Sequence, residues 1–293
     1  MGREIIWQIE SNYALVSCIN NGRGIIVEKE IAPKDVNITN ISWVNEVSIF
    51  FREKLSKLGV PLASPYLCFE KDGKAIQQSP YVGLDIEKIF QGGKAELLII
   101  EKMLTAMKGV LEQKTPEVGI DARLSNFCIG PNNEIYYVDT FPPLVKYGEK
   151  YIVHFPNPTN QKTIQEELKR KFDPMGILRR FRFAILEQNV GFTENDILCC
   201  IHNALGYELA AKAKNFFTTF LDHLEVNDAF DQLNLNDPDG IRELALKLIP
   251  SNGDRKIFLK EIFNLSSNFC PYNLTKKERM DKIKILMQAQ ICV

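Results

Sequence analysis

The chain has 293 residues, of which 45% are hydrophobic and 25% are charged, and its formal net charge is −1 at pH 7. This composition is ordinary for a globular protein with a substantial core, built as one large domain or two modest ones. A net charge near zero provides no broad field to attract nucleic acid or an anionic membrane surface, so neither is expected as a partner.

The seven cysteines are scattered along the chain, odd in number and without C-x-x-C spacing. This usage is typical of reduced thiols in a cytoplasmic protein. The N-terminal apolar run is too short for a secretory signal, and no window approaches the length of about 18 apolar residues that spans a membrane. We therefore expect a cytoplasmic protein without membrane spans.

The N-terminal region predicts an antiparallel meander. Apolar runs at residues 5–9, 13–19 and 25–27 are separated by turn residues, and Asn-Asn-Gly-Arg-Gly between the last two is a hairpin signature. Lys29 shares a face with Val27 by the two-residue alternation of a strand. A lysine among core residues requires an anionic partner, although a lysine that protects an edge strand is the alternative.

A helix and a second hairpin follow. Apolar residues with a period of roughly 3.6 predict a helix over residues 42–58, with Ser42 available as its N-cap. Residues 66–70 and 74–78 have strand character around a Lys-Asp-Gly turn. Residues 78–83 are then expected to form a connector, because Pro80 cannot continue a central strand.

The pattern becomes helical after residue 83, with helices predicted over 84–90 and 95–111. The second helix leads to Asp121, which is followed by Asn126 and then by two short apolar runs around a Pro-Asn-Asn turn, with Asp139 at the far end. Pairing of this hairpin brings Asn126 and Asp139 together, and two hard oxygen ligands facing one cavity suit Mg²⁺. Asp121 is then expected beside the metal, where a base belongs.

Beyond Pro143 the chain is predicted to be loop-like up to residue 160 and mostly helical afterwards. The expected helices are 161–172, 174–188, 193–225, 238–249, 254–265 and 275–291, with starts at Thr193 and Asp237. A basic run could grip an anionic substrate or phosphate, although solvated helix faces are the simpler interpretation. Its members are Lys169, Arg170, Lys171, Arg179, Arg180 and Arg182.

The segment from Asp121 to Asp139 resembles the catalytic segment of the protein-kinase-like superfamily. Within that superfamily it is most similar in style to the aminoglycoside and choline phosphotransferase branch. The family's loop is D-x-x-x-x-N with a metal-binding Asp thirteen residues after the Asn, and Asn126 to Asp139 is also thirteen. The resemblance implies an α+β, two-lobed protein-kinase-like fold. A small antiparallel β-sheet with one helix would form an N-terminal nucleotide-binding lobe over residues 1–82. A mainly helical lobe over residues 83–293 would hold the catalytic loop and the substrate site.

The resemblance also implies ATP and Mg²⁺ as cofactors. Asn126 and Asp139 would bind the metal, Asp121 would act as the base, and Arg123 would steady the transferring phosphoryl group. Further residues would hold the nucleotide: Lys29 on the α- and β-phosphates, paired with Glu46 (Glu53 as second choice), Ser11 and Asn12 in the turn over the phosphates, and main-chain groups near Ser79, Tyr81 and Val82 at the adenine. Without the family pattern, Glu46 and Glu53 are simply solvated carboxylates of a helix face.

Three departures from the family pattern shape the functional prediction. No G-x-G-x-x-G precedes Lys29, which favours a small-molecule kinase. Ile120 stands before Asp121, where a bracing His-containing dipeptide is usual. Asp139 is followed by Thr-Phe-Pro-Pro, with no Asp-Phe-Gly and no Ala-Pro-Glu downstream, which argues against a phosphorylation-regulated activation loop. The sequence therefore predicts an ATP- and Mg-dependent phosphotransferase acting on a hydroxyl group of a small molecule. A pseudokinase that docks a protein partner, an atypical protein kinase and a nucleotidyl transferase are the alternatives.

Overall fold

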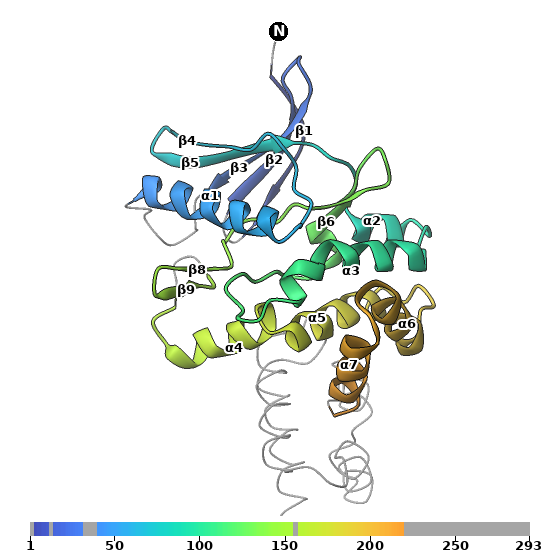
Figure 1. The fold of residues 1–293 in the computed structure, drawn as a ribbon. Helices are drawn as coiled ribbons and strands as arrows, with labels where there is room; N and C mark the ends of the chain where they lie inside the picture. Colours follow the sequence, from blue (N-terminus) through green and yellow to red (C-terminus); the bar gives the residue numbers. More distant parts are fainter. Residues whose placement is uncertain (1–2, 12–13, 32–39, 155–157, 220–293) are drawn as a thin grey trace, which may run out of the picture. The chain divides into compact units, whose positions relative to one another are not determined.

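The computed structural model describes residues 3–11, 14–31, 40–154 and 158–219 (Figure 1). Its internal contacts divide the chain into two units, residues 1–213 and residues 214–293. The features below belong to the first unit, except that the last described helix continues to residue 219. The predicted lobe boundary after residue 82 lies inside that unit and stays a prediction. The helices predicted over 238–249, 254–265 and 275–291, and the start at Asp237, lie outside the described residues.

A five-stranded antiparallel sheet opens the chain (Figure 1). Its strands are β1 (Glu4–Glu10), β2 (Ala14–Asn20), β3 (Ile25–Ile31), β4 (Leu67–Lys71) and β5 (Lys74–Pro80), in the spatial order β1-β2-β3-β5-β4. The predicted meander is confirmed, and the Asn21 side-chain oxygen shapes its second turn by accepting hydrogen bonds from the N–H groups of Arg23 and Gly24. Lys29 lies within β3, opposite Val16 on β2 and Gln77 on β5.

Pro80 is the last residue of β5, so its assignment to a connector is wrong. It lies opposite Ile26 on β3, whereas β4 begins only opposite Gln78. The next residue, Tyr81, donates its N–H to the Ile25 carbonyl at 3.0 Å, so Pro80 occupies a position whose missing N–H points away from β3. Because β4 does not extend to Pro80, the proline removes no ladder hydrogen bond.

Helix α1 (Ile41–Lys57) packs against β4 and β5 (Figure 1). The predicted helix is confirmed, but its N-cap is Asn40 rather than Ser42, because the Asn40 side chain accepts the N–H of Trp43 at 2.9 Å. A side-chain oxygen at this position satisfies a donor that the first helical turn leaves unpaired. The buried face of α1 is formed by Val44, Val47, Ser48, Phe51, Arg52 and Leu55.

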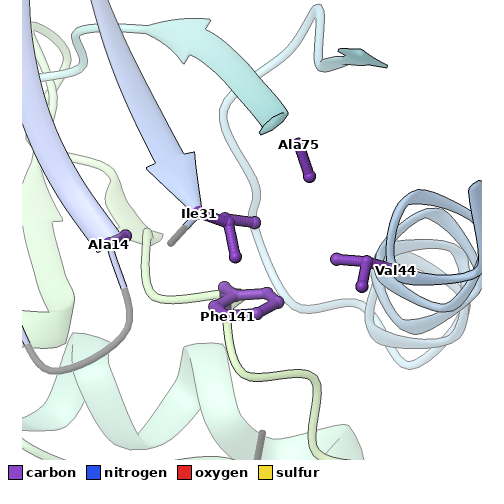
Figure 2. Close-up of a cluster of buried hydrophobic side chains, with 5 residues drawn as sticks. All are labelled: Ala14, Ile31, Val44, Ala75 and Phe141. Atoms are coloured by element: carbon purple, nitrogen blue, oxygen red, sulfur yellow. The ribbon is translucent and has the colours of Figure 1, made fainter. Parts of the chain in front are cut away.

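One buried apolar cluster joins the sheet, α1 and the chain that follows Asp139 (Figure 2). It comprises Ala14, Ile31, Val44, Ala75 and Phe141. The Phe141 ring reaches this cluster from the segment just after Asp139, and burial of such a ring contributes about 1.5–3 kcal/mol. The backbone beside Asp139 is therefore fixed to the core of the N-terminal sheet.

The described chain after the N-terminal sheet and α1 is mainly helical. Its elements are α2 (Ile86–Gln91), α3 (Leu97–Leu111), the short 3-10 helix η1 (Leu124–Asn126), the hairpin β6 (Phe127–Ile129) with β7 (Ile135–Tyr137), the hairpin β8 (Val145–Tyr147) with β9 (Lys150–Ile152), α4 (Gln161–Lys171), α5 (Pro174–Leu186), α6 (Glu194–Leu205) and α7 (Tyr207–Thr219). The architecture of the described chain is thus α+β, an antiparallel sheet followed by helices. None of its described helices is both long and apolar enough to cross a bilayer.

Two secondary-structure predictions in this region are wrong. The stretch expected to be a loop contains β8 and β9, joined by a turn in which Gly148 has φ 58°. The single helix expected over 193–225 is interrupted at Gly206, whose φ of 91° is left-handed and incompatible with a continuous helix. The start at Thr193 is confirmed, because Thr193 and Asp196 form a reciprocal capping box.

Candidate active site

The predicted hairpin between Asn126 and Asp139 is confirmed as β6 and β7. Asn133 adopts φ 57° in the turn, a conformation that asparagine tolerates, and Gly130 donates its N–H to the Glu134 carbonyl at 2.8 Å. Phe127 then lies opposite Tyr137, and the Val138 N–H donates to the Asn126 carbonyl at 2.9 Å. Asn126 and Asp139 are therefore carried to the same end of one paired ribbon.

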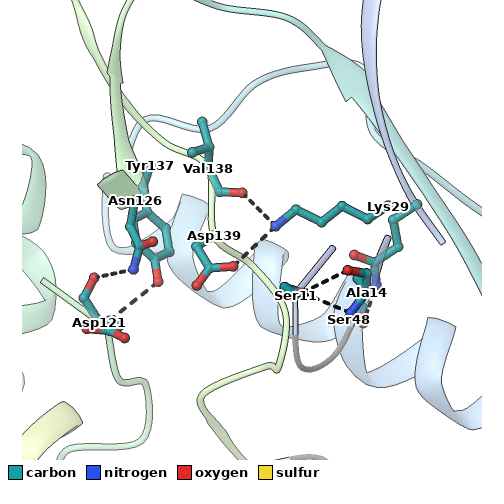
Figure 3. Close-up of polar contacts among 10 residues, drawn as sticks. Ser11, Ala14, Lys29, Ser48, Asp121, Asn126, Tyr137, Val138 and Asp139 are labelled. Atoms are coloured by element: carbon teal, nitrogen blue, oxygen red, sulfur yellow. Dashed lines mark hydrogen bonds and ion pairs between the residues drawn. The ribbon is translucent and has the colours of Figure 1, made fainter. Parts of the chain in front are cut away.

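A hydrogen bond to the loop before it orients the Asn126 side chain. The amide Nδ2 donates to the Asp121 carbonyl at 3.0 Å (Figure 3). With the nitrogen engaged in this way, the Oδ1 atom is the one that can coordinate a cation. The same bond ties Asn126 to Asp121, so these two predicted site residues are held together.

Asp139 makes an ion pair with Lys29 of the N-terminal sheet. The Lys29 Nζ lies 3.2 Å from Asp139 Oδ1 and donates a second hydrogen bond to the Val138 carbonyl at 3.4 Å (Figure 3). The lysine side chain is 19% exposed and the aspartate 32%, so both ends of the pair can be reached by a ligand. The anionic partner that Lys29 was expected to need is thus the predicted metal ligand.

The predicted pairing of Lys29 with Glu46 is wrong. Glu46 is exposed on α1 and accepts a hydrogen bond from the Tyr147 hydroxyl of β8, while Glu53 is also exposed. The α1 residue that faces the sheet near Lys29 is Ser48, which accepts a hydrogen bond from Gln77 Nε2 at 2.9 Å. Residues two apart on a helix do not share a face, so Glu46 points away when Ser48 points inward.

Two arginines approach the Asp121 carboxylate, which is 16% exposed. Arg123 Nε lies 3.4 Å from Oδ2, and Arg180 Nε, from α5, lies 4.0 Å from Oδ1. The Tyr137 hydroxyl accepts the Asp121 main-chain N–H at 3.4 Å. Burial raises the pKa of Tyr137 well above its usual value, and the negative charges of Asp139 and Asp121 add to this effect, so the hydroxyl stays protonated beside the carboxylates.

The junction of α4 and α5 supports the loop that carries Asp121. The Ile120 N–H donates to the Lys171 carbonyl at 2.8 Å, and the Gly119 N–H donates to the Leu144 carbonyl at 2.8 Å. A Cβ atom on Gly119 would lie 2.6 Å from the Lys171 carbonyl oxygen, so only glycine allows this approach. Ile120 is fully buried, and with its main-chain hydrogen bond it holds the Asp121 loop in place. The sequence did not predict this role for the residue before Asp121.

The segment between β5 and α2 runs along β6. The Ile129 N–H donates to the Leu84 carbonyl at 3.1 Å, and Gly83, with φ 143°, lies so close that an added Cβ would be 2.0 Å from the Ile129 carbonyl oxygen. Ser79 lies on β5 opposite Val27; Tyr81 and Val82 complete the segment. Tyr81 and Val82 thus lead directly into the contact with β6, whereas Ser79 is part of the sheet, and the role of all three at the adenine stays a prediction.

Of the residues predicted to cover the phosphates, Ser11 bonds to Ala14 and Asn12 lies outside the described residues. The Ser11 hydroxyl donates to the Ala14 carbonyl at 2.8 Å, and its oxygen accepts the Ala14 N–H at 3.0 Å. These bonds tie the residue after β1 to the first residue of β2, whose Val16 lies opposite Lys29.

Arg180 is the site residue that sequence reasoning did not select. It was noticed only as part of a basic run, and it reaches Asp121 because α5 packs against η1. The signal in the sequence was an arginine at a position between the buried residues Ile177, Leu178 and Phe181. A charged side chain so close to the core needs a partner or a function.

The donor set fits Mg²⁺ in chemistry. In the described part of the chain no group of three or more His, Cys, Asp and Glu side chains could hold a metal. The two predicted ligands are one carboxylate, that of Asp139, and one amide oxygen, that of Asn126. Mg²⁺ is commonly bound by one or two carboxylates, with water and phosphate oxygens completing its shell. No protein-family model matches the chain, and a search of curated proteins finds no match.

Proposed function

We propose that the chain is an ATP- and Mg²⁺-dependent phosphotransferase with a protein-kinase-like fold, which transfers the γ-phosphoryl group to a hydroxyl of a small molecule. The observation that carries the proposal is the set of contacts that joins four polar residues from separate segments. Asn126 bonds to Asp121, Val138 bonds to Asn126, and Lys29 pairs with Asp139. Partly buried charges are costly to maintain, and their convergence on one place favours a functional site.

Each residue has a role in this reaction. The Asp121 carboxylate accepts the proton of the acceptor hydroxyl. At the same time the hydroxyl oxygen forms a bond to the γ-phosphorus, and the bond between that phosphorus and the β–γ bridging oxygen breaks. A positioned base of this kind contributes about 10²- to 10⁴-fold to the rate. Lys29 neutralises the α- and β-phosphates, and Arg123 stabilises charge on the moving phosphoryl group.

Asn126 Oδ1 and the Asp139 carboxylate would hold Mg²⁺. The metal, when bound, supplies positive charge that offsets the negative charge of the phosphate oxygens. The Lys29 ammonium, now on Asp139, would then be shared with the nucleotide phosphates. This exchange requires only a side-chain movement, because both groups of the pair are partly exposed.

A small-molecule acceptor is favoured over a protein acceptor by the segments around the site. The chain after Asp139 runs directly into the core through Phe141 and then forms the β8–β9 hairpin. Ser11, whose hydroxyl bonds to the Ala14 carbonyl, stands where protein kinases carry a glycine-rich loop. Both features support the phosphotransferase branch of the superfamily.

A pseudokinase is the second candidate, and the Lys29–Asp139 ion pair favours it. A lysine that neutralises a metal ligand at 3.2 Å competes directly with the cation for that ligand. In such a protein the Lys29–Asp139 pair would only connect the N-terminal sheet to the β6–β7 hairpin, and no phosphoryl transfer would take place. The two candidates differ in whether Mg²⁺ and ATP displace the lysine.

Calorimetry with ATP and Mg²⁺, followed by ADP release over a panel of hydroxyl compounds, tests the proposal. We expect the wild-type protein to bind Mg-ATP, Asp121→Ala to bind it equally well without turnover, and Asp139→Asn to lose the metal dependence of binding. Glu70→Gln, an exposed change on β4, is the control. Binding without any turnover by the wild type supports the pseudokinase, and an absence of nucleotide binding refutes both candidates.

A further inference from the structure

Gln77 is a buried polar residue of β5 that the proposed reaction does not use. Its side chain is only 2% exposed, and its amide Nε2 donates to the Ser48 hydroxyl of α1 at 2.9 Å. The other amide atom, Oε1, is buried and has no hydrogen-bond partner among the described residues. Most buried side-chain oxygens have such a partner, because burial without one costs free energy. An apolar residue of the same length would avoid this cost, so the amide oxygen favours a role beyond packing.

Gln77 and Lys29 are neighbours on one face of the sheet. They lie directly opposite each other on β5 and β3, and the Cβ atoms of such a pair are about 4.5–5.5 Å apart on the same face. Val16 of β2 flanks Lys29 on its other side, and Cys68 of β4 flanks Gln77 on its other side. Lys29 is the one cation in this row of four residues. Gln77 therefore presents an amide beside the lysine that is proposed to hold the α- and β-phosphates.

The Lys29 ammonium is not fully used by its contacts. It has three N–H donors, and in the described chain it donates to Asp139 Oδ1 at 3.2 Å and to the Val138 carbonyl at 3.4 Å (Figure 3). Both distances exceed the value of about 2.7–2.9 Å that is typical of charge-assisted hydrogen bonds. Partly exposed ion pairs also contribute little to stability, and the lysine stem is flexible. The ammonium can therefore exchange one acceptor for another.

Helix α1 offers this lysine no carboxylate. The buried face of α1 carries Ser48, whereas Glu46 and Glu53 are exposed. When Asp139 binds Mg²⁺, as proposed, Lys29 gives up its acidic partner. A neutral amide is a suitable replacement, because it orients the ammonium by a hydrogen bond and leaves the positive charge to the phosphates.

We propose that Gln77 positions Lys29 in the nucleotide-bound state. The Lys29 Nζ moves away from Asp139 and donates to Gln77 Oε1, and its remaining N–H groups donate to phosphate oxygens. Ser48 holds the Nε2 end of the amide and so fixes the direction of its oxygen. The inference rests on the proposed binding of Mg-ATP and adds a positioning residue to it. An ion pair that occupies a metal ligand is in this way exchanged for a neutral hydrogen bond when the nucleotide binds.

A double-mutant cycle on Mg-ATP binding tests the inference. Gln77→Met removes the acceptor and keeps the length of the side chain, and we expect it to weaken Mg-ATP binding by about three- to tenfold in calorimetry. In a Lys29→Met background the same change should have no effect, because Gln77 acts only through the lysine. A loss of affinity caused by misfolding would appear in both backgrounds.

Gln78→Met is the matched control, because it makes the same chemical change at the next residue of β5. Gln78 lies on the opposite face of the sheet, by the alternation of a strand, and donates to Glu28 of β3 at 2.6 Å. We expect this variant to bind Mg-ATP with the affinity of the wild type.

A crystal structure of the wild type with Mg²⁺ and a non-hydrolysable ATP analogue keeps the inference decidable even if Gln77→Met does not fold. We expect the Lys29 Nζ within about 3.2 Å of Gln77 Oε1, and no longer in contact with Asp139.

Three results overturn the inference while nucleotide binding is intact. They are equal Mg-ATP affinity of the wild type and Gln77→Met, an equal loss of affinity in the wild-type and Lys29→Met backgrounds, and a nucleotide-bound structure in which Lys29 remains on Asp139. Failure of the phosphotransferase proposal has a different signature. Either the wild type does not bind Mg-ATP, which refutes both proposals, or Asp121→Ala retains turnover, which leaves the role of Gln77 standing.

Discussion

The Lys29 ammonium lies 3.2 Å from Asp139 Oδ1, 110 residues further along the chain. This contact joins the N-terminal sheet to the hairpin that carries the proposed metal ligands. It also replaces the pairing with a helix carboxylate that the sequence led us to expect. The position of Lys29 is therefore set by the site itself and not by α1.

Lys29→Met is expected to weaken Mg-ATP binding by at least about tenfold, which corresponds to about 1.4 kcal/mol. The lysine is the cation proposed for the α- and β-phosphates. Its effect on the free energy of unfolding should be small, at most about 1 kcal/mol, because partly exposed ion pairs contribute little. Calorimetry and urea denaturation measure the two effects. Lys74→Met, which removes an exposed pair with Glu30, is the control, and equal ATP affinity in both variants would contradict the role of Lys29.

Glu46→Gln is expected to leave Mg-ATP affinity within about twofold of the wild type. The carboxylate accepts a hydrogen bond from Tyr147 on the exposed side of α1, and an exposed hydrogen bond of this kind contributes about 1 kcal/mol or less to stability. The same titration as for Lys29→Met provides the measurement. A tenfold loss would show that Glu46 turns inward when nucleotide binds.

Gly83→Ala is expected to destabilise the protein by about 1–3 kcal/mol, because overpacking at a fixed backbone contact displaces its neighbours. A Cβ there would lie 2.0 Å from the Ile129 carbonyl oxygen, and the φ of 143° is unfavourable for alanine. Nucleotide affinity should fall as well, because the segment borders the proposed adenine site. Gly24→Ala, where a Cβ meets nothing within 4 Å, should change neither quantity in urea denaturation and calorimetry.

Glu167 should make stability depend on pH in the acidic range. Burial alone would raise the pKa of Glu167, but the hydrogen bond with His154 and the charges of Lys171 and Arg170 outweigh it and lower the pKa to about 2. A depressed folded-state pKa stabilises the protein above the unfolded value near 4.5, by roughly 3 kcal/mol for a shift of this size. This stability is lost as the pH falls from about 4.5 to about 2.

Urea denaturation of the wild type and Glu167→Gln between pH 7 and pH 3 isolates this effect. The difference in unfolding free energy should be largest at pH 7 and shrink towards pH 3. Glu70→Gln on the exposed face of β4 controls for the titration of other carboxylates. A difference that stays constant with pH would mean that Glu167 is not the titrating group.

The hairpin and the positions of Asn126 and Asp139 at its end could be predicted from the sequence because their signals are local. A turn of suitable residues between two β-rich runs fixes the register, and the register places Asn126 beside the segment that leads to Asp139. Lys29 was found in the same way, from the alternation along β3. In each case the residues that carry the sequence pattern lie close along the chain to the structural feature that they predict.

The errors have equally physical causes. The buried positions Val44, Val47 and Phe51 fix the rotation of α1 and place Ser48, not Glu46, towards the sheet. The apolar pattern of this helix was therefore sufficient to predict that Glu46 points away from Lys29. Arg180 could not be assigned to Asp121 by any local pattern, because the contact depends on how α5 packs against the loop. Strands as short as β8 and β9 are set by their pairing partner more than by propensity.

The loop with the proposed base is held by main-chain atoms, with the Ile120 N–H on the Lys171 carbonyl. A main-chain hydrogen bond does not depend on the side chain at either residue. The surfaces of α4 and α5 could therefore be changed to suit another acceptor without disturbing the position of Asp121. The length of the α4–α5 junction could not be changed in the same way. One residue inserted or deleted just before Phe172 would shift the Lys171 carbonyl that accepts the Ile120 N–H, and would displace the Asp121 carboxylate with it.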